Sequence, residues 1–136
     1  MVKLIMGLKG SGKTKILIEL IHKAADEEDG DVVCIEKGSK LTYDIPYKVR
    51  LIDTSRYCIS GYDYFKGFIS GLYSANYDIT HIFIDSVLKI IGVDVDEKMD
   101  EFLSWCEEFS KRENVKLTIM LSVDVALATD GLKKYF

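Results

Sequence analysis

The sequence contains little proline, cysteine or tryptophan, and it has no long apolar run. One Pro in 136 residues, together with 48% hydrophobic residues, excludes a collagen-like or disordered chain. The three cysteines are odd in number and too widely spaced for a Cys-x-x-Cys pair, which excludes a disulfide scaffold. No segment approaches the ~18 consecutive apolar residues that a membrane crossing needs. We therefore expect one globular domain over residues 1–136 and no membrane span.

Positive charge is also scarce, with 18 Lys and Arg residues against 22 Asp and Glu residues and a net charge of −4. This balance argues against a general nucleic-acid or anionic-membrane surface, although it allows a local basic patch. Met1 leads directly into a strand-like run, which leaves no room for a signal peptide. Free thiols suit the cytosol, and Cys34 and Cys106 lie in apolar patterns typical of core residues. We expect a cytoplasmic protein.

Apolar strand-like runs alternate with helical patterns along the chain. Strands are expected at residues 2–6, 32–35, 48–53, 81–85 and 115–121. Helices are expected at residues 13–25, 61–77 and 94–113, with a short helix or docked end at 132–136. The 48–53 run alternates before it becomes apolar, which favours an edge or antiparallel strand, and the acidic 26–30 segment is expected to be a solvated turn. This order predicts an α/β fold with three layers, a mostly parallel sheet of about five strands, and ligands beyond the carboxyl ends of the strands.

One segment matches the pattern G-x-x-x-x-G-K-[ST] at every specified position: Gly7-Leu8-Lys9-Gly10-Ser11-Gly12-Lys13-Thr14. A strand-like run precedes it and an amphipathic helical pattern follows it. The glycines let the backbone turn tightly and bring its N–H groups close to phosphate oxygens at a helix N-terminus. Lys13 would reach the β- and γ-phosphates, and the Thr14 hydroxyl would ligate Mg²⁺. Lys9 would face either solvent or a phosphate edge.

This motif in this context resembles the P-loop nucleoside triphosphatase superfamily. The resemblance implies ATP or GTP as ligand, with Mg²⁺. The form Gly7-x-x-Gly10-x-Gly12-Lys13-Thr14 also looks like the loop of small nucleoside and nucleotide kinases. Lys9 stands four residues before Lys13, whereas the deviant loop of the partition and septum-positioning ATPases has a lysine five residues before, so that subclass is not supported. The N-K-x-D guanine motif of many GTPases is absent, which favours ATP.

Asp85 ends an apolar run, Ile82-Phe83-Ile84-Asp85, that resembles a Walker B strand. Its carboxylate would hold Mg²⁺, directly or through a water, close to Thr14. Many ATPases of this architecture place a catalytic Glu next, but here the next residue is Ser86. Glu36, which follows the 32–35 run, occupies the place where RecA-like ATPases tend to present that Glu, and Asp53 is a second candidate. A turn carboxylate with no catalytic role remains the alternative for Glu36.

Other strand ends supply further candidates. Ser122 ends a strand that would lie between the phosphate-loop strand and the Asp85 strand, and in additional-strand ATPases this place holds a polar residue that senses the γ-phosphate. Only three arginines occur, and Arg56, after the 48–53 run, is the one placed to reach a nucleotide. His22 and His81 lack metal-ligand spacing and are interpreted as a helix-surface and a strand-start residue. The tyrosines concentrated in the central third are either packing residues or a partner surface.

Three functions of different classes fit these features. The first is a minimal Mg²⁺-dependent ATPase with a RecA-like core, loosely similar to the secretion and twitching-motility ATPases but without their histidine-bearing and acidic segments and N-terminal domain. The second is a small-molecule phosphotransferase, loosely similar to thymidine kinase, although that family's Asp-Glu pair is Asp85-Ser86 here and its cysteine zinc segment is absent. The third is a nucleotide-binding subunit that does not hydrolyse. A core of this size leaves little for a lid or acceptor domain, which favours action with a protein partner or as a homo-oligomer.

Overall fold

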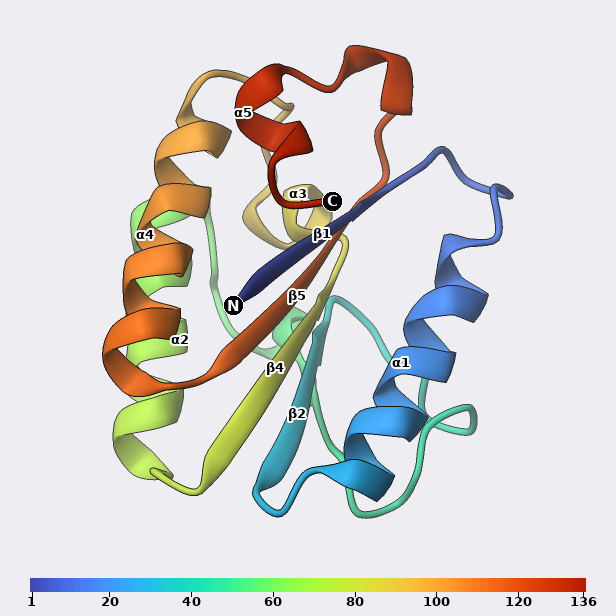
Figure 1. The fold of residues 1–136 in the computed structure, drawn as a ribbon, viewed down its shortest axis with the longest axis vertical. Helices are drawn as coiled ribbons and strands as arrows, with labels where there is room; N and C mark the ends of the chain where they lie inside the picture. Colours follow the sequence, from blue (N-terminus) through green and yellow to red (C-terminus); the bar gives the residue numbers. More distant parts are fainter.

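The computed structural model describes residues 1–136 and contains a single five-stranded sheet in which all pairings are parallel. Figure 1 shows the sheet in the middle of the molecule, with helices on both sides. The strands are β1 (Val2–Met6), β2 (Asp31–Glu36), β3 (Arg50–Asp53), β4 (Ile79–Asp85) and β5 (Lys116–Leu121). The longer helices are α1 (Lys13–Glu27), α2 (Gly61–Ala75) and α4 (Lys98–Glu113), and the short ones are α3 (Val87–Ile91) and α5 (Asp130–Lys133). The predicted three-layer α/β architecture is confirmed.

The strand order is β1-β5-β4-β2-β3, so β5 separates β1 from β4, as the resemblance to additional-strand ATPases implied. The three inner strands are buried on both faces, which explains why they read as nearly continuous apolar runs. β3 is the edge strand that the alternation indicated, but the antiparallel alternative is wrong because β3 pairs parallel to β2. Alternation reports that one face is exposed, and it carries no information about strand direction.

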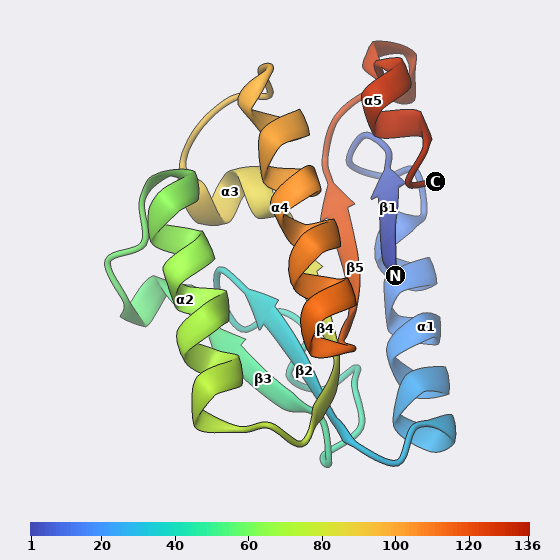
Figure 2. The same ribbon diagram turned by 60° about the vertical axis from the view of Figure 1, so that its left-hand side comes forward.

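Side chains that alternate along the strands divide the interior into two layers. Figure 2 shows α2, α3 and α4 on one face of the sheet and α1 on the other. The layer under α2, α3 and α4 contains 24 buried residues. The layer under α1 contains ten, which come from α1, three inner strands and the connection between β2 and β3. Cys34, Phe83 and Met120 lie in this thinner layer. The residues two positions further along the chain, Glu36 and Asp85 at the ends of their strands and Ser122 just after β5, also face the α1 side.

The helices differ from expectation in two places. α4 begins at Lys98 rather than near residue 94, because the side chain of Asp96 accepts a hydrogen bond from the Lys98 N–H at 2.9 Å and ends the preceding loop. α3 was not predicted, since five residues are too few to display a helical period. The C-terminal segment is docked as expected, with α5 followed by Tyr135, whose carbonyl accepts a hydrogen bond from the Leu4 N–H at 2.7 Å on the outer edge of β1.

The acidic turn after α1 is only partly solvated, which corrects the prediction for residues 26–30. The Glu28 side chain is 13% exposed, and its Oε2 lies 2.7 Å from Nδ1 of His81 and 3.7 Å from Nζ of Lys116. The Nε2 of His81 lies 2.8 Å from the Thr118 hydroxyl, and the imidazole stacks on Phe83 with ring centroids 4.0 Å apart. His81 is thus an interior residue of β4 with two polar partners. The interpretation of this histidine as a strand-start residue missed its burial.

Candidate functional site

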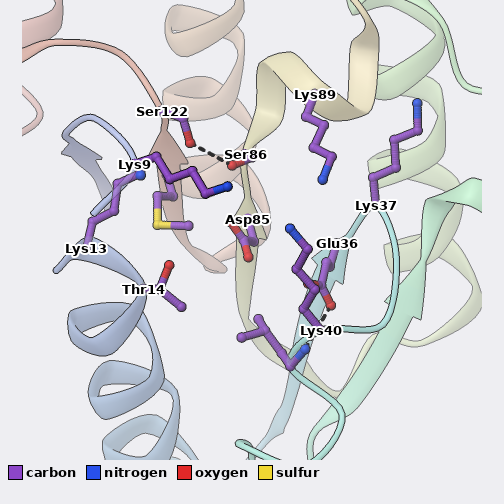
Figure 3. A pocket seen from close by; sticks show the side chains of 12 residues that line it. Lys9, Lys13, Thr14, Glu36, Lys37, Lys40, Asp85, Ser86, Lys89 and Ser122 are labelled. Carbon is purple, nitrogen blue, oxygen red and sulfur yellow. Dashed lines mark hydrogen bonds between the residues drawn. The ribbon is translucent and has the colours of Figure 1, made fainter. Parts of the chain in front are cut away.

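A pocket of about 330 Å³ lies beyond the carboxyl ends of β1, β5, β4 and β2, where a parallel sheet of this kind holds its ligands. Figure 3 shows it from close by. Six of the residues singled out from the sequence line it: Lys9, Lys13, Thr14, Glu36, Asp85 and Ser122. Six more complete the lining: Lys37, Lys40, Leu41, Ser86, Lys89 and Met120. The topology therefore brings together side chains that are separated by more than one hundred residues in the chain.

The phosphate-loop segment turns from β1 into α1 as the glycine spacing predicts. Gly10 and Gly12 have φ angles of 86° and 87°, in the left-handed region that glycine adopts without strain. Gly12 is the N-cap of α1, so the helix begins at Lys13. Gly7 is buried beneath Ser11, with too little room for a β-carbon beside the Ser11 hydroxyl. Leu8 is exposed and does not line the pocket, so any contact of this residue with a phosphate would come from its backbone.

Lys13 is the most unusual charge in this segment. It is 6% exposed, and none of the six ion pairs in the structure involves it. Figure 3 shows its side chain rising toward the loop. A largely buried lysine is uncommon without a partner, because its charged group needs a counter-charge or hydrogen bonds. Its position at the first turn of α1, inside a loop of glycines, offers that counter-charge from an anion bound by the loop.

Asp85 and Glu36 end neighbouring strands and are partners in the register of β4 and β2. Burial raises the pKa of Asp85, although Ser86 and the ammonium groups of Lys13, Lys40 and Lys89 oppose the rise. Burial also raises the pKa of Glu36, and the nearby charge of Asp85 adds to that rise. Glu36 is 3% exposed, and its Oε2 accepts a hydrogen bond from the Leu41 N–H at 3.3 Å. The site therefore holds two coupled carboxyl groups that are easier to protonate than ordinary ones.

Ser86 and Ser122 connect the ends of β4 and β5. Their hydroxyl oxygens lie 3.0 Å apart in a hydrogen bond that Figure 3 draws as a dashed line. Ser86 has φ 61° and ψ 71°, a left-handed conformation that is uncommon for a residue other than glycine. Such conformations cost roughly 1–3 kcal/mol and cluster at functional sites. The turn from β4 into α3 thus places one hydroxyl beside Asp85 and in contact with the residue predicted to sense a phosphate.

Sequence reasoning missed three lysines of the lining. Lys37 and Lys40 lie on the connection between β2 and β3, and Lys89 lies on α3. The available signal was the position of Lys37 and Lys40, which follow Glu36 within four residues at a strand end. No such signal existed for Lys89, because α3 itself was not predicted.

Two other candidates lie outside the pocket. Asp53 accepts hydrogen bonds from the Ser55 hydroxyl at 2.6 Å and from the backbone N–H groups of Ser55 and Gly38 at 2.9 Å and 2.8 Å. These bonds, with the charge of Arg56, lower the pKa of Asp53. Neither Asp53 nor Arg56 lines the pocket. Their roles in this structure are to form the turn after β3 and to anchor the start of the β2–β3 connection.

The pocket offers oxygen donors suited to a hard divalent cation. No group of three or more His, Cys, Asp or Glu side chains forms a metal site in the structure. Thr14 and Asp85, however, place a hydroxyl and a carboxylate in the same pocket. Mg²⁺ is commonly bound by one or two protein oxygens together with substrate phosphates and waters. This donor set fits Mg²⁺ that arrives with a phosphorylated ligand, and it does not fit a cation bound by protein alone.

The expectations from composition also concern the helices and the cysteines. None of the helices combines the length and the apolar character that a membrane crossing requires. Cys34 and Cys106 are buried, Cys58 is exposed, and all three are free thiols.

Comparison with known proteins identifies the fold. Neither a protein-family model nor a curated protein sequence matches the chain. Among solved structures, it is similar to a KaiC-like protein from the hyperthermophilic archaeon Pyrococcus horikoshii OT3, with a TM-score of 0.67 and 18% sequence identity. The match covers 98% of this chain and 66% of that one, so the chain spans a little under two thirds of the length of this neighbour. At this identity, what the two proteins share is the fold.

Proposed function

We propose that this protein binds ATP together with Mg²⁺ and acts as a minimal P-loop ATPase that works with a protein partner or as a homo-oligomer. The observation that carries the proposal is Lys13, which is 6% exposed, forms none of the six ion pairs, lines the pocket and lies within a glycine-rich loop at the start of α1. A triphosphate would supply the missing negative charge. The fold shared with the KaiC-like protein supports a P-loop core, and the identity of the nucleotide is part of the proposal.

The roles follow from the placement of each group. Backbone N–H groups of the phosphate loop and the Lys13 ammonium would bind the β- and γ-phosphates. Thr14 and Asp85 would hold Mg²⁺, which neutralises charge on the phosphate oxygens when it is bound. Ser122, held by Ser86, would contact the γ-phosphate from the end of β5.

Glu36 is the proposed group that positions and deprotonates the attacking water. It is the buried carboxyl group of the pocket, and the Leu41 N–H holds one of its oxygens. Its raised pKa brings its proton affinity closer to neutral pH, as general-base catalysis favours. Ser86 occupies the position where a Glu would follow Asp85, so the neighbouring strand β2 supplies the carboxyl group instead.

Calorimetric titration of the purified protein with ATP and GTP, with and without Mg²⁺, tests binding. Replacement of Lys13 by Ala should weaken ATP binding roughly ten- to hundredfold, because a hydrogen bond to a charged group contributes about 1.5–3 kcal/mol. The matched control is Lys15→Ala, which removes the same charge from an exposed position of the same helix. Equal loss in both variants, or no ATP binding by the wild type at millimolar concentration, would disprove the proposal.

Phosphate release measured on the same proteins separates hydrolysis from binding alone. The wild type should release phosphate faster than Lys13→Ala. Tight binding without any difference in phosphate release would instead favour a nucleotide-binding subunit that does not hydrolyse. Inclusion of nucleosides and nucleotides as acceptors in the assay tests the phosphotransferase alternative, which predicts a phosphorylated product in place of free phosphate.

A further inference from the structure

Five lysines line the pocket, although the chain as a whole has a net charge of −4. The only acidic side chains in the lining are Glu36 and Asp85, so the lining has an excess of three positive charges when both are ionised. None of these lysines takes part in any of the six ion pairs of the structure. Cations gathered in this way repel each other, and they create a local field that attracts an anion.

Two of the lysines lie opposite the phosphate loop. Figure 3 shows the side chains of Lys40 and Lys89 extending toward each other beside Asp85, while the Lys37 side chain extends away from both. Both Lys40 and Lys89 line the same pocket as Asp85. They come from separate elements, the β2–β3 connection and α3, and they reach the same space from two sides.

Neither lysine is on a loosely held segment. Next to Lys40, Leu41 is 2% exposed and its N–H donates to Glu36. Upstream of Lys40, the Gly38 N–H donates to Asp53 at 2.8 Å. Lys89 lies one residue before Ile90 and Ile91, which are 2% and 1% exposed and fix α3 on the core. The bases of both side chains are therefore held in place, and only the long stems need to order when an anion binds.

We propose that Lys40 and Lys89 form a second anion subsite, across Asp85 from the phosphate loop, which holds the terminal phosphoryl group of the bound nucleotide. This inference rests on the proposed function, because it assumes that a triphosphate occupies the loop. The subsite lies on the same chain, and none of the three arginines lines the pocket. The two lysines thus supply, from within the chain, cationic groups that bind the γ-phosphate but have no partner in a diphosphate.

The test is the ratio of ATP affinity to ADP affinity, measured by calorimetric titration in the presence of Mg²⁺. In Lys40→Met and in Lys89→Met the affinity for ATP should fall about tenfold or more, because each variant loses a charge-assisted contact. The affinity for ADP should change by less than about threefold, a difference worth well under one such contact. Lys37→Met, which removes the same charge from the same connection, should leave the ratio at its wild-type value.

Each outcome bears on the inference. A wild-type ratio in the Lys40→Met/Lys89→Met double variant would overturn it, as would equal losses of ATP and ADP affinity, which indicate only a general field. If circular dichroism shows that Lys89→Met does not fold, Lys40→Met and the charge-preserving Lys89→Arg decide. Lys40→Met should lower the ratio of ATP affinity to ADP affinity, and Lys89→Arg should leave this ratio at its wild-type value. Wild-type protein that binds neither nucleotide would overturn the proposed function and, with it, the subsite. Wild-type protein that binds both nucleotides, combined with an unchanged ratio in the variants, would overturn the subsite alone.

Discussion

Replacement of His81 by Ala should destabilise the protein although His81 lies at the end of the sheet opposite the pocket. The Nδ1 of His81 donates to the Glu28 carboxylate at 2.7 Å, because a carboxylate only accepts, and Nε2 then accepts from the Thr118 hydroxyl at 2.8 Å. The first bond involves a charged group and contributes about 1.5–3 kcal/mol, and the second contributes about 0.5–1.5 kcal/mol. Removal of both should lower the free energy of unfolding by about 2–4.5 kcal/mol, a large share of the 5–15 kcal/mol typical of a domain.

Urea unfolding at pH 7.5, followed by circular dichroism, measures this loss as a lower midpoint at an unchanged slope. His22→Ala is the matched control, since its imidazole is exposed and its only hydrogen bond is to the Asp44 carbonyl at 2.9 Å. That variant should lose less than about 0.5 kcal/mol, as surface substitutions usually do. A double-mutant cycle with Glu28→Gln should give a coupling energy of about 0.5–3 kcal/mol, because the two side chains are in contact.

The lowered pKa of His81 predicts how the stability of the fold changes with pH. Burial lowers the pKa of His81, although the bond to Glu28 opposes the shift. The unfolded chain therefore binds a proton more readily than the folded one, and stability falls as pH decreases below the ordinary histidine pKa of about 6.5. Between pH 7.5 and 5.5 the wild type should lose more stability than His81→Ala. Equally small losses of stability in His81→Ala and His22→Ala, with the same pH dependence in His81→Ala as in the wild type, would refute this reasoning. The hydrogen bonds of His81 with Glu28 and Thr118 would then contribute little to the stability of the fold.

Two further predictions concern the pocket and the helices. Glu36→Gln should raise the melting temperature at pH 7, because burial and Asp85 raise the pKa of Glu36 and its ionised form destabilises the fold. Below about pH 4, where Glu36 is protonated, the variant and the wild type should melt at the same temperature. A melting temperature equal to that of the wild type at both pH values would contradict the electrostatic cost of ionised Glu36. The same variant should reduce phosphate release about a hundredfold or more if Glu36 is the base. Gly12→Ala should lower the free energy of unfolding by about 1–2 kcal/mol, because its φ of 87° suits glycine alone. Gly71→Ala, on an exposed turn of α2 with open space around the added methyl group, should instead raise it by about 0.5–1 kcal/mol, and urea unfolding of both variants checks the opposite signs.

Much of the fold could be predicted because its central strands are buried on both faces. Such strands read as apolar runs, and the helical periods between them imply crossovers and hence a parallel sheet. The position of β5 between β1 and β4 came from the resemblance to additional-strand ATPases, and the sheet order confirms it. The direction of β3 and the existence of α3 could not be predicted, since the first depends on which neighbour the strand pairs with and the second is a single short turn.

Some residues of the candidate site could be predicted from the sequence and others could not. The loop of residues 7–14 and Asp85 have local signatures, because phosphate binding requires particular residue types at fixed spacing. Lys40 and Lys89 have none, since a flexible cation can reach an anion from many positions in a chain. The pair of Glu28 and His81 is separated by 53 residues, and a pattern within a short window cannot reveal it. Only the meeting of α1 with β4 in the folded chain makes that contact.

The unequal layers of the interior have a consequence for how the protein opens. α1 packs against the sheet in a cluster of ten buried residues that includes its own, whereas the helices on the other face share a cluster of 24. Local opening takes the least free energy where the buried apolar area is smallest, so the amide protons of α1 should exchange with solvent sooner than those of α4. The phosphate loop runs directly into the first turn of α1. An anion bound by the loop would stabilise only the closed form of that helix, so by linkage a bound nucleotide would reduce how often α1 separates from the sheet.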